Sequence, residues 1–82
     1  MTPTELKLQS IVAEKLKIDS SKVLLDQSVT DDLGLDSFDV MAVILEIEQA
    51  FPPVTLSDDA AQNLKTLRDV ATYIDEQLAA SD

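Results

Sequence analysis

Residues 31–51 read DDLGLDSFDVMAVILEIEQAF, an acidic segment that leads directly into an amphipathic helix. Asp36 or Ser37 suits the N-cap of this helix, because a short polar side chain can accept a hydrogen bond from a free N–H group of the first turn. Pro52-Pro53 follows the segment, and a residue before proline disfavours helical backbone angles. The pattern therefore predicts a helix over 37–50.

This helix carries apolar residues on two sides when it is turned by about 100° per residue. One side is wide enough to face a core and consists of Val40, Val43, Ile44, Ile47 and Phe51. A second stripe, spaced at i, i+3 and i+7, consists of Phe38, Met41 and Leu45. The stripe suits a helix that is packed on both sides, and it equally suits a surface that docks into a partner's groove.

Three further segments have helical features. Residues 2–5 (Thr-Pro-Thr-Glu) form a capping-box pattern with proline in the first turn, so a first helix should begin at Pro3 and continue to about residue 17. Ser57 opens a short third helix, and Leu67 begins a last one. The apolar stripe of the last helix consists of Leu67, Val70, Ala71, Ile74 and Leu78. Because no strand pattern appears, we predict an all-α fold, a small four-helix bundle with three main helices and one short helix.

The segment from Ile18 to Asp36 lacks a helical period and is predicted to be a long loop between the first and second helices. Loops of this length are uncommon in compact domains unless they serve a function. We expect apolar side chains to hold it on the core, namely Val23, Leu24, Leu25, Val29, Leu33 and Leu35.

The 82 residues suit one domain over 1–82 with a thin core. The chain contains no Cys and no His, which excludes thiolate nucleophiles, imidazole bases and Cys/His metal sites. The remaining Asp and Glu pairs fall on solvated faces. We therefore expect no catalytic residues, no metal site and no enzymatic activity.

Sixteen Asp and Glu against six Lys and Arg give a formal net charge of −10. This charge repels nucleic acid and anionic membranes, and it attracts basic protein partners. The sequence shows neither a signal-peptide pattern nor an apolar run that could span a bilayer. We expect a cytoplasmic monomer that binds no nucleic acid and does not insert stably into membranes.

The segment Asp31-Asp32-Leu33-Gly34-Leu35-Asp36-Ser37-Phe38-Asp39 closely resembles the attachment signature of the acyl carrier proteins. In that family, Leu-Gly, a variable residue and Asp-Ser stand at the start of the second helix. The resemblance covers nearly the whole chain. It also includes Glu14-Lys15-Leu16, Val23, Asp26, Phe51 and Val70-Ala71-Thr72-Tyr73-Ile74.

The resemblance implies that a phosphopantetheinyl transferase attaches 4′-phosphopantetheine to the hydroxyl of Ser37, and that the arm then carries acyl groups as thioesters. Asp36 would help to orient this site, and Gly34, the only glycine, would allow a tight turn or a close backbone approach before it. A helix start suits a phosphate, because its N–H groups and dipole favour negative charge. The other implied partners are acyl-loading, condensing and acyl-transfer enzymes of a fatty-acid, polyketide or dedicated lipid pathway.

The resemblance further implies a docking surface on the second helix and a pocket for the acyl chain. The docking residues would be Phe38, Asp39, Met41, Leu45, Glu46 and Glu48, and the pocket residues Val43, Ile47 and Ile74. Phe38 replaces the usual leucine, and Ala42 stands where fatty-acid carriers commonly have glutamate. Both departures favour a dedicated pathway.

The alternative is an unmodified helical interaction module that docks through Phe38, Met41 and Leu45. An Asp-Ser pair at a helix start is most often only a cap. A gain of the arm's mass after incubation with coenzyme A and a transferase separates the two hypotheses.

Overall fold

The computed structural model describes residues 1–80, apart from the side chain of Asp58. In chain order its elements are α1 (Pro3–Leu16), η1 (Ser20–Lys22), α2 (Ser37–Ala50), α3 (Asp58–Asn63) and α4 (Leu67–Ala80). Over this part of the chain the fold contains helices and no strand. The predicted all-α bundle is confirmed, and η1, a single 3₁₀ turn within the long loop, was not predicted.

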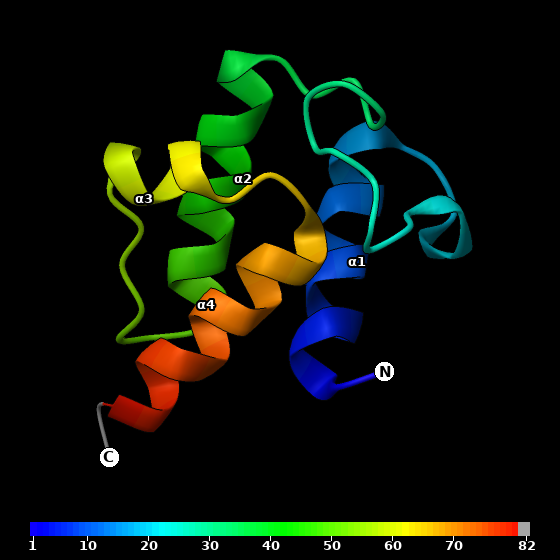
Figure 1. Cartoon of the computed structure of the whole chain (residues 1–82). Helices are drawn as coiled ribbons and strands as arrows, with labels where there is room; N and C mark the ends of the chain where they lie inside the picture. Colours follow the sequence, from blue (N-terminus) through cyan, green and yellow to red (C-terminus); the bar gives the residue numbers. More distant parts are fainter. Residues whose placement is uncertain (81–82) are drawn as a thin grey trace.

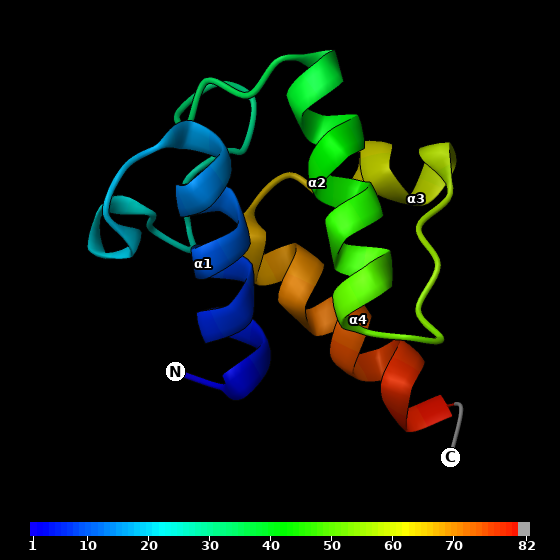
Figure 2. The same cartoon turned by 180° about the vertical axis from the view of Figure 1, so that it is seen from behind.

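The helices are arranged around α1, which packs against both α2 and α4. In both views α2 lies between α1 and α3 (Figures 1 and 2). The first turn of α2 lies beside the long loop, at the opposite end of the molecule from the start of α1 and the end of α4 (Figure 1). No helix in the described part of the chain is long and apolar enough to cross a membrane.

The helix ends follow local sequence signals. Thr2 Oγ1 accepts a hydrogen bond from the Glu5 N–H at 3.1 Å, and Glu5 Oε1 accepts one from the Thr2 N–H at 2.8 Å, so the predicted capping box is present. The helix ends at Leu16, one residue before the predicted end, because Lys17 adopts a left-handed conformation with φ of 60°. These caps hold α1 in the register that buries its apolar face.

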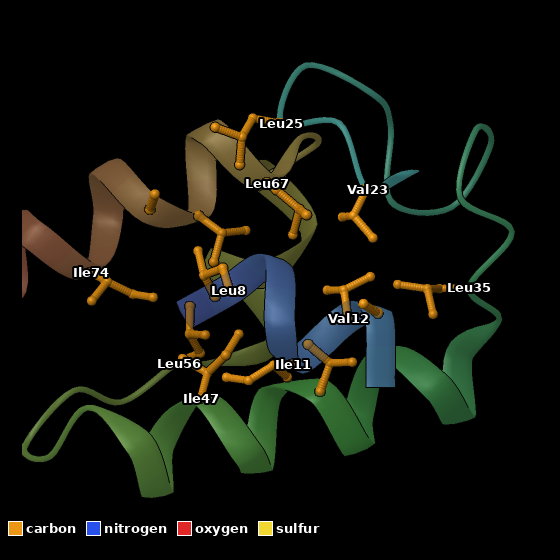
Figure 3. Packing of buried hydrophobic residues seen from close by; sticks show 14 of the residues in the cluster. Leu8, Ile11, Val12, Val23, Leu25, Leu35, Ile47, Leu56, Leu67 and Ile74 are labelled. Atoms are coloured by element: carbon orange, nitrogen blue, oxygen red, sulfur yellow. The ribbon is translucent and has the colours of Figure 1, made fainter. Parts of the chain in front are cut away.

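The core forms where α1, α2 and α4 meet the inner side of the loop. Figure 3 shows Leu8 and Val12 of α1 converging with Ile47 of α2 and Leu67 of α4. The largest fully buried side chains are Leu8, Ile47, Leu67, Ile74, Val12 and Val23. The apolar sides predicted for the second and last helices therefore meet α1 at the centre of the core.

The long loop is held on the core by alternate side chains. Val23, Leu25 and Leu35 are buried, but Leu24 is 53% exposed, so the prediction that Leu24 helps to hold the loop is wrong. The backbone at Val23 is extended, and successive side chains of an extended segment point to opposite sides. Leu24 therefore faces solvent when its two neighbours face the core.

Arg68 of α4 fastens the middle of this loop. Its N–H donates to the Leu25 carbonyl at 3.0 Å, and its Nε donates to Asp26 Oδ1 at 2.7 Å. The hydrogen bond and the charge of the guanidinium lower the pKa of the Asp26 carboxyl from its ordinary value of 3.8. Beyond this point, the Val29 N–H donates to the Lys65 carbonyl at 3.0 Å. These contacts fix the position of the loop before it reaches the start of α2.

Candidate functional site

Ser37 is the first residue of α2 and is exposed to solvent. Asp36 precedes it as the N-cap, and Asp36 Oδ1 accepts a hydrogen bond from the Asp39 N–H at 2.9 Å. The Asp36 carbonyl accepts the Val40 N–H at 2.9 Å. The N–H groups of Ser37 and Phe38 have no acceptor within the helix, as is usual for a first turn. An accessible hydroxyl therefore stands beside N–H groups that can meet an anion.

Gly34 makes the turn that brings the chain to this helix start. Its φ is 74°, in the left-handed region that favours glycine. A Cβ at this position would have no atom within 4 Å, so open space surrounds the residue. Of the two reasons expected for this glycine, the turn applies and the close backbone approach does not. The adjacent Leu35 is buried, which anchors the chain two residues before Ser37.

The apolar stripe of α2 lies outside the core. Phe38 is 83% exposed, Met41 62% and Leu45 58%. These values decide between the two readings of the stripe, since a helix packed on both sides would bury it. Together the three residues form an exposed apolar surface that starts one residue after Ser37, as a docking surface requires.

The carboxylates of α2 and of its cap differ in their surroundings. Asp36 and Asp39 flank Ser37. Glu46 Oε1 lies 3.9 Å from Lys15 Nζ of α1, whereas Glu48 Oε2 accepts a hydrogen bond from the Leu56 N–H at 3.0 Å. Glu48 therefore also holds the segment between α2 and α3, a contact that helical spacing could not indicate.

An apolar cavity of about 50 Å³ lies beside the inner side of α2. Of the three residues expected to form an acyl-chain pocket, Val43 and Ile47 line this cavity, whereas Ile74 is fully buried and is not on its wall. Leu67 and Val70 supply the contribution of α4 instead. The lining residues that the sequence analysis missed include Val29, Leu35, Val40, Ile44, Ala61 and Leu64. Ala61 and Leu64 come from α3 and the residue after it, so α3 closes the cavity on the side away from α1.

A second, more open space of about 740 Å³ lies between α2 and the α3 side of the molecule. We call it the hollow. Ser37, Met41 and Ile44 line it from α2, and Gln62 and Lys65 line it from α3 and the residues that follow. The hollow and the cavity share walls at Val29, Val40, Ile44, Ala61 and Leu64. The hollow therefore extends from the serine to side chains that also line the apolar cavity.

These residues fit the prosthetic group that the sequence resemblance implies. The group needs an unhindered hydroxyl, and the Ser37 side chain is exposed. It also brings a phosphate, for which the first turn of α2 offers N–H groups and the positive end of the helix dipole.

Comparison with known proteins gives a consistent result. The family model described as a phosphopantetheine attachment site matches residues 6–74. An acyl carrier protein of Exiguobacterium sibiricum is 45% identical over 71 residues, which cover 87% of this chain and 89% of the relative. One of Trieres chinensis is 41% identical over 73 residues, covering 89% and 90%. The solved structure of an acyl carrier protein from Enterococcus faecalis superposes with a TM-score of 0.72 at 30% identity, covering 87% of this chain and 89% of that one.

Proposed function

Because this chain belongs to the acyl carrier proteins, a family of carriers rather than catalysts that bear 4′-phosphopantetheine, we propose that Ser37 is its attachment residue and aliphatic acyl chains are its cargo. The observation that carries the proposal is the position of Ser37. Ser37 is the first residue of α2, directly after the Asp36 cap, and it lies inside the matched segment. Its hydroxyl is exposed to solvent.

The attachment reaction is simple for this chain, because Ser37 only supplies a nucleophilic oxygen. Ser37 Oγ forms a new P–O bond to the phosphopantetheine phosphate of coenzyme A. The P–O bond to adenosine 3′,5′-bisphosphate breaks, and the serine proton passes to a base of the transferase. The thiol of the bound arm then carries acyl groups as thioesters. Asp36 contributes by capping the first turn of α2 beside the serine.

The chemistry of the cavity supports an aliphatic cargo. Every side chain that lines it in the described structure is apolar. A keto oxygen buried there would lose its hydrogen bonds to water without gaining a partner, at a cost of about 1–3 kcal/mol. A polyketide intermediate carries such groups along its chain, whereas a saturated acyl chain carries none. The cavity is also smaller than the ~150 Å³ that accommodates benzene, so α3 must move away from α2 to admit a longer chain.

Thermal unfolding of two loaded carriers tests this cargo. A transferase can place octanoyl- and 3-oxooctanoyl-phosphopantetheine on Ser37 from the matching coenzyme A thioesters. We expect the octanoyl carrier to melt at least about 4 °C above the 3-oxo carrier, because about 1 kcal/mol shifts the melting temperature of a domain this size by 4–8 °C. Equal melting temperatures, or a more stable 3-oxo carrier, would contradict an aliphatic preference.

The exposed stripe gives this carrier its docking surface. Phe38, Met41 and Leu45 would fill a pocket of each partner enzyme, while Asp36 and Asp39 would attract basic groups around it. The partners we propose are the transferase and acyl-loading, condensing and acyl-transfer enzymes. We further propose that this carrier is a cytoplasmic monomer and that it serves a dedicated lipid pathway. The bulky Phe38 beside the arm supports the dedicated pathway.

A further inference from the structure

One peptide group in the segment between α2 and α3 is held from both sides. The segment comprises residues 51–57, and the peptide group joins Thr55 to Leu56. Its N–H donates to Glu48 Oε2 of α2 at 3.0 Å, and its carbonyl accepts from the Tyr73 hydroxyl of α4 at 3.3 Å. We call these two hydrogen bonds the clamp. The clamp connects α2 to α4 through backbone that belongs to neither helix.

The clamp continues into α4. The Gln77 side-chain amide donates to the Tyr73 hydroxyl oxygen at 3.4 Å, which leaves the hydroxyl proton for the Thr55 carbonyl. Hydrogen bonds in such a chain polarise and strengthen one another. Glu48 and Tyr73 are both half-buried, which limits competition from water. The position of the peptide group is therefore fixed relative to both α2 and α4.

The clamp also fixes one wall of the apolar cavity. Leu56 is buried and lines the cavity, as does Ile47, the residue before Glu48. Because its N–H meets Glu48, Leu56 lies near the C-terminal end of α2, and Figure 3 shows it beside Ile47. The lining residues of α2 extend from Val40 to Ile47, about 10 Å along the helix axis. Leu56 thus forms the wall at the end of the cavity that is more distant from the start of α2.

The opposite end of the cavity lies toward the proposed attachment residue. The side chains that the cavity shares with the hollow include Val40 and Ile44, whereas Ile47 and Leu56 line the cavity alone in the described structure. An acyl chain that enters between α2 and α3 on the shared side therefore meets Leu56 last. Each methylene that enters is removed from water and stabilises the folded carrier. A chain too long for the cavity must displace the Leu56 wall or remain partly outside.

We propose that Glu48 and Tyr73 are positioning residues that set the length of acyl chain the cavity holds, because they fix Leu56 at its far end. This rests on the proposed attachment to Ser37 and on the aliphatic cargo. Glu48 acts here through the backbone of the segment between α2 and α3, and its carboxylate touches neither the cargo nor a partner enzyme. The clamp thereby gives Glu48 a role apart from the docking surface on which the sequence placed it.

The test measures how strongly each acyl chain stabilises the carrier. A transferase loads Ser37 from coenzyme A thioesters of saturated acids that lengthen by two carbons at a time, from butanoyl to hexadecanoyl, and intact mass verifies loading. The readout is the melting temperature of each loaded carrier minus that of the same variant with the unloaded arm. This subtraction removes any general loss of stability that a substitution causes.

The variants remove the two halves of the clamp separately. Glu48→Ala removes the acceptor, and Tyr73→Phe removes the hydroxyl donor but keeps the ring. Glu48→Gln keeps a side-chain oxygen that can accept the N–H, so it should preserve the clamp. Glu46→Ala is the matched control, because it removes the same charge from the same helix at a residue that pairs with Lys15 of α1 instead.

In the wild type we expect the melting temperature to rise by about 3–6 °C for each methylene that becomes buried, up to a limiting chain length. Glu48→Ala and Tyr73→Phe should move this limit to longer chains by at least one step of the series. Glu48→Gln and Glu46→Ala should keep the limit of the wild type. An unchanged or shorter limit in Glu48→Ala and Tyr73→Phe, or a longer limit in Glu46→Ala, would overturn the proposal.

Mass and melting temperature separate this inference from the proposed function. A chain that gains no arm refutes attachment, and with it the role of the clamp. Loaded carriers that no saturated chain stabilises refute the aliphatic cargo, and again the role of the clamp with it. A wild type that is stabilised up to a limit which both clamp variants share refutes only this inference.

Discussion

Replacing Phe38 with leucine should leave the fold almost unchanged and alter which partner enzymes accept the carrier. Phe38 is 83% exposed and lies one residue after the proposed attachment serine. Any enzyme that reaches the arm must pass this ring. A pocket shaped for phenylalanine would be partly empty around leucine, whereas a pocket shaped for leucine would accept the variant better.

The stability change can be worked from the exposure of the ring. A fully buried phenylalanine removes roughly 150–250 Å² from water, so the small covered part of Phe38 amounts to roughly 35 Å². At about 25 cal/mol per Å², this area contributes less than ~1 kcal/mol to the free energy of unfolding. Leucine keeps part of the contact and has the higher helix propensity. We therefore expect the melting temperature to fall by no more than about 4 °C.

Ile47→Val on the same helix is the matched control for stability, because Ile47 is 2% exposed. It removes one buried methylene and should cost about 0.5–1.5 kcal/mol. Turnover is measured with the arm-bearing wild type, with Phe38→Leu, and with Phe38→Leu combined with Ala42→Glu. A housekeeping ketosynthase should use the double variant about fivefold better than the wild type, as expected when one docking residue changes by ~1 kcal/mol.

Two results would refute this reasoning. A fall in melting temperature beyond about 8 °C for Phe38→Leu would mean that the ring contributes more than ~1 kcal/mol, as a core residue does. Equal turnover of all three carriers by the ketosynthase would mean that Phe38 and Ala42 do not determine the choice of partner. Phe38 would then give no support to a dedicated pathway.

Three further predictions follow from the same structure. Gly34→Ala should lower the free energy of unfolding by about 1–2 kcal/mol because of its positive φ, and a melting temperature equal to the wild type would contradict this. Arg68 lowers the pKa of Asp26, so the stability from this contact should be complete above the ordinary value of 3.8 and be lost as the pH falls through the lowered pKa. Asp26→Asn should flatten that acidic part of the curve of unfolding free energy against pH, and an unchanged curve would count against the contact. Partner on-rates should fall as salt rises, and Asp39→Asn should weaken this dependence; rates independent of salt would exclude electrostatic steering.

The parts of the fold that the sequence predicted correctly depend on local signals. The bounds of α2 follow from the Asp36 cap and from Pro52-Pro53, and the start of α1 follows from a capping box over residues 2–5. Each signal acts within a few residues, so it can be read without knowing the tertiary structure. The position of Ser37 at a helix start was predictable for the same reason.

The features that the sequence did not reveal depend on contacts between distant segments. Asp26 and Arg68 are 42 residues apart, and neither residue has a local pattern that indicates the other. The α3 wall of the cavity comes from Ala61 and Leu64, which belong to a segment too short to show an apolar period. The exposure of the stripe of α2 was likewise undecided, because only the positions of the other helices determine which apolar side meets the core.

The most direct test of the central claim is the location of the arm in the modified chain. The wild type and Ser37→Ala are incubated with coenzyme A and a broad-specificity phosphopantetheinyl transferase, and the products are fragmented for mass spectrometry. The alanine variant should keep its fold, since Asp36 rather than Ser37 supplies the cap of α2. We predict that the wild type gains one phosphopantetheine on the peptide fragment containing Ser37 and that Ser37→Ala gains none. An added mass on Ser28, Thr30 or any other residue, or modification of a folded Ser37→Ala, would contradict the account.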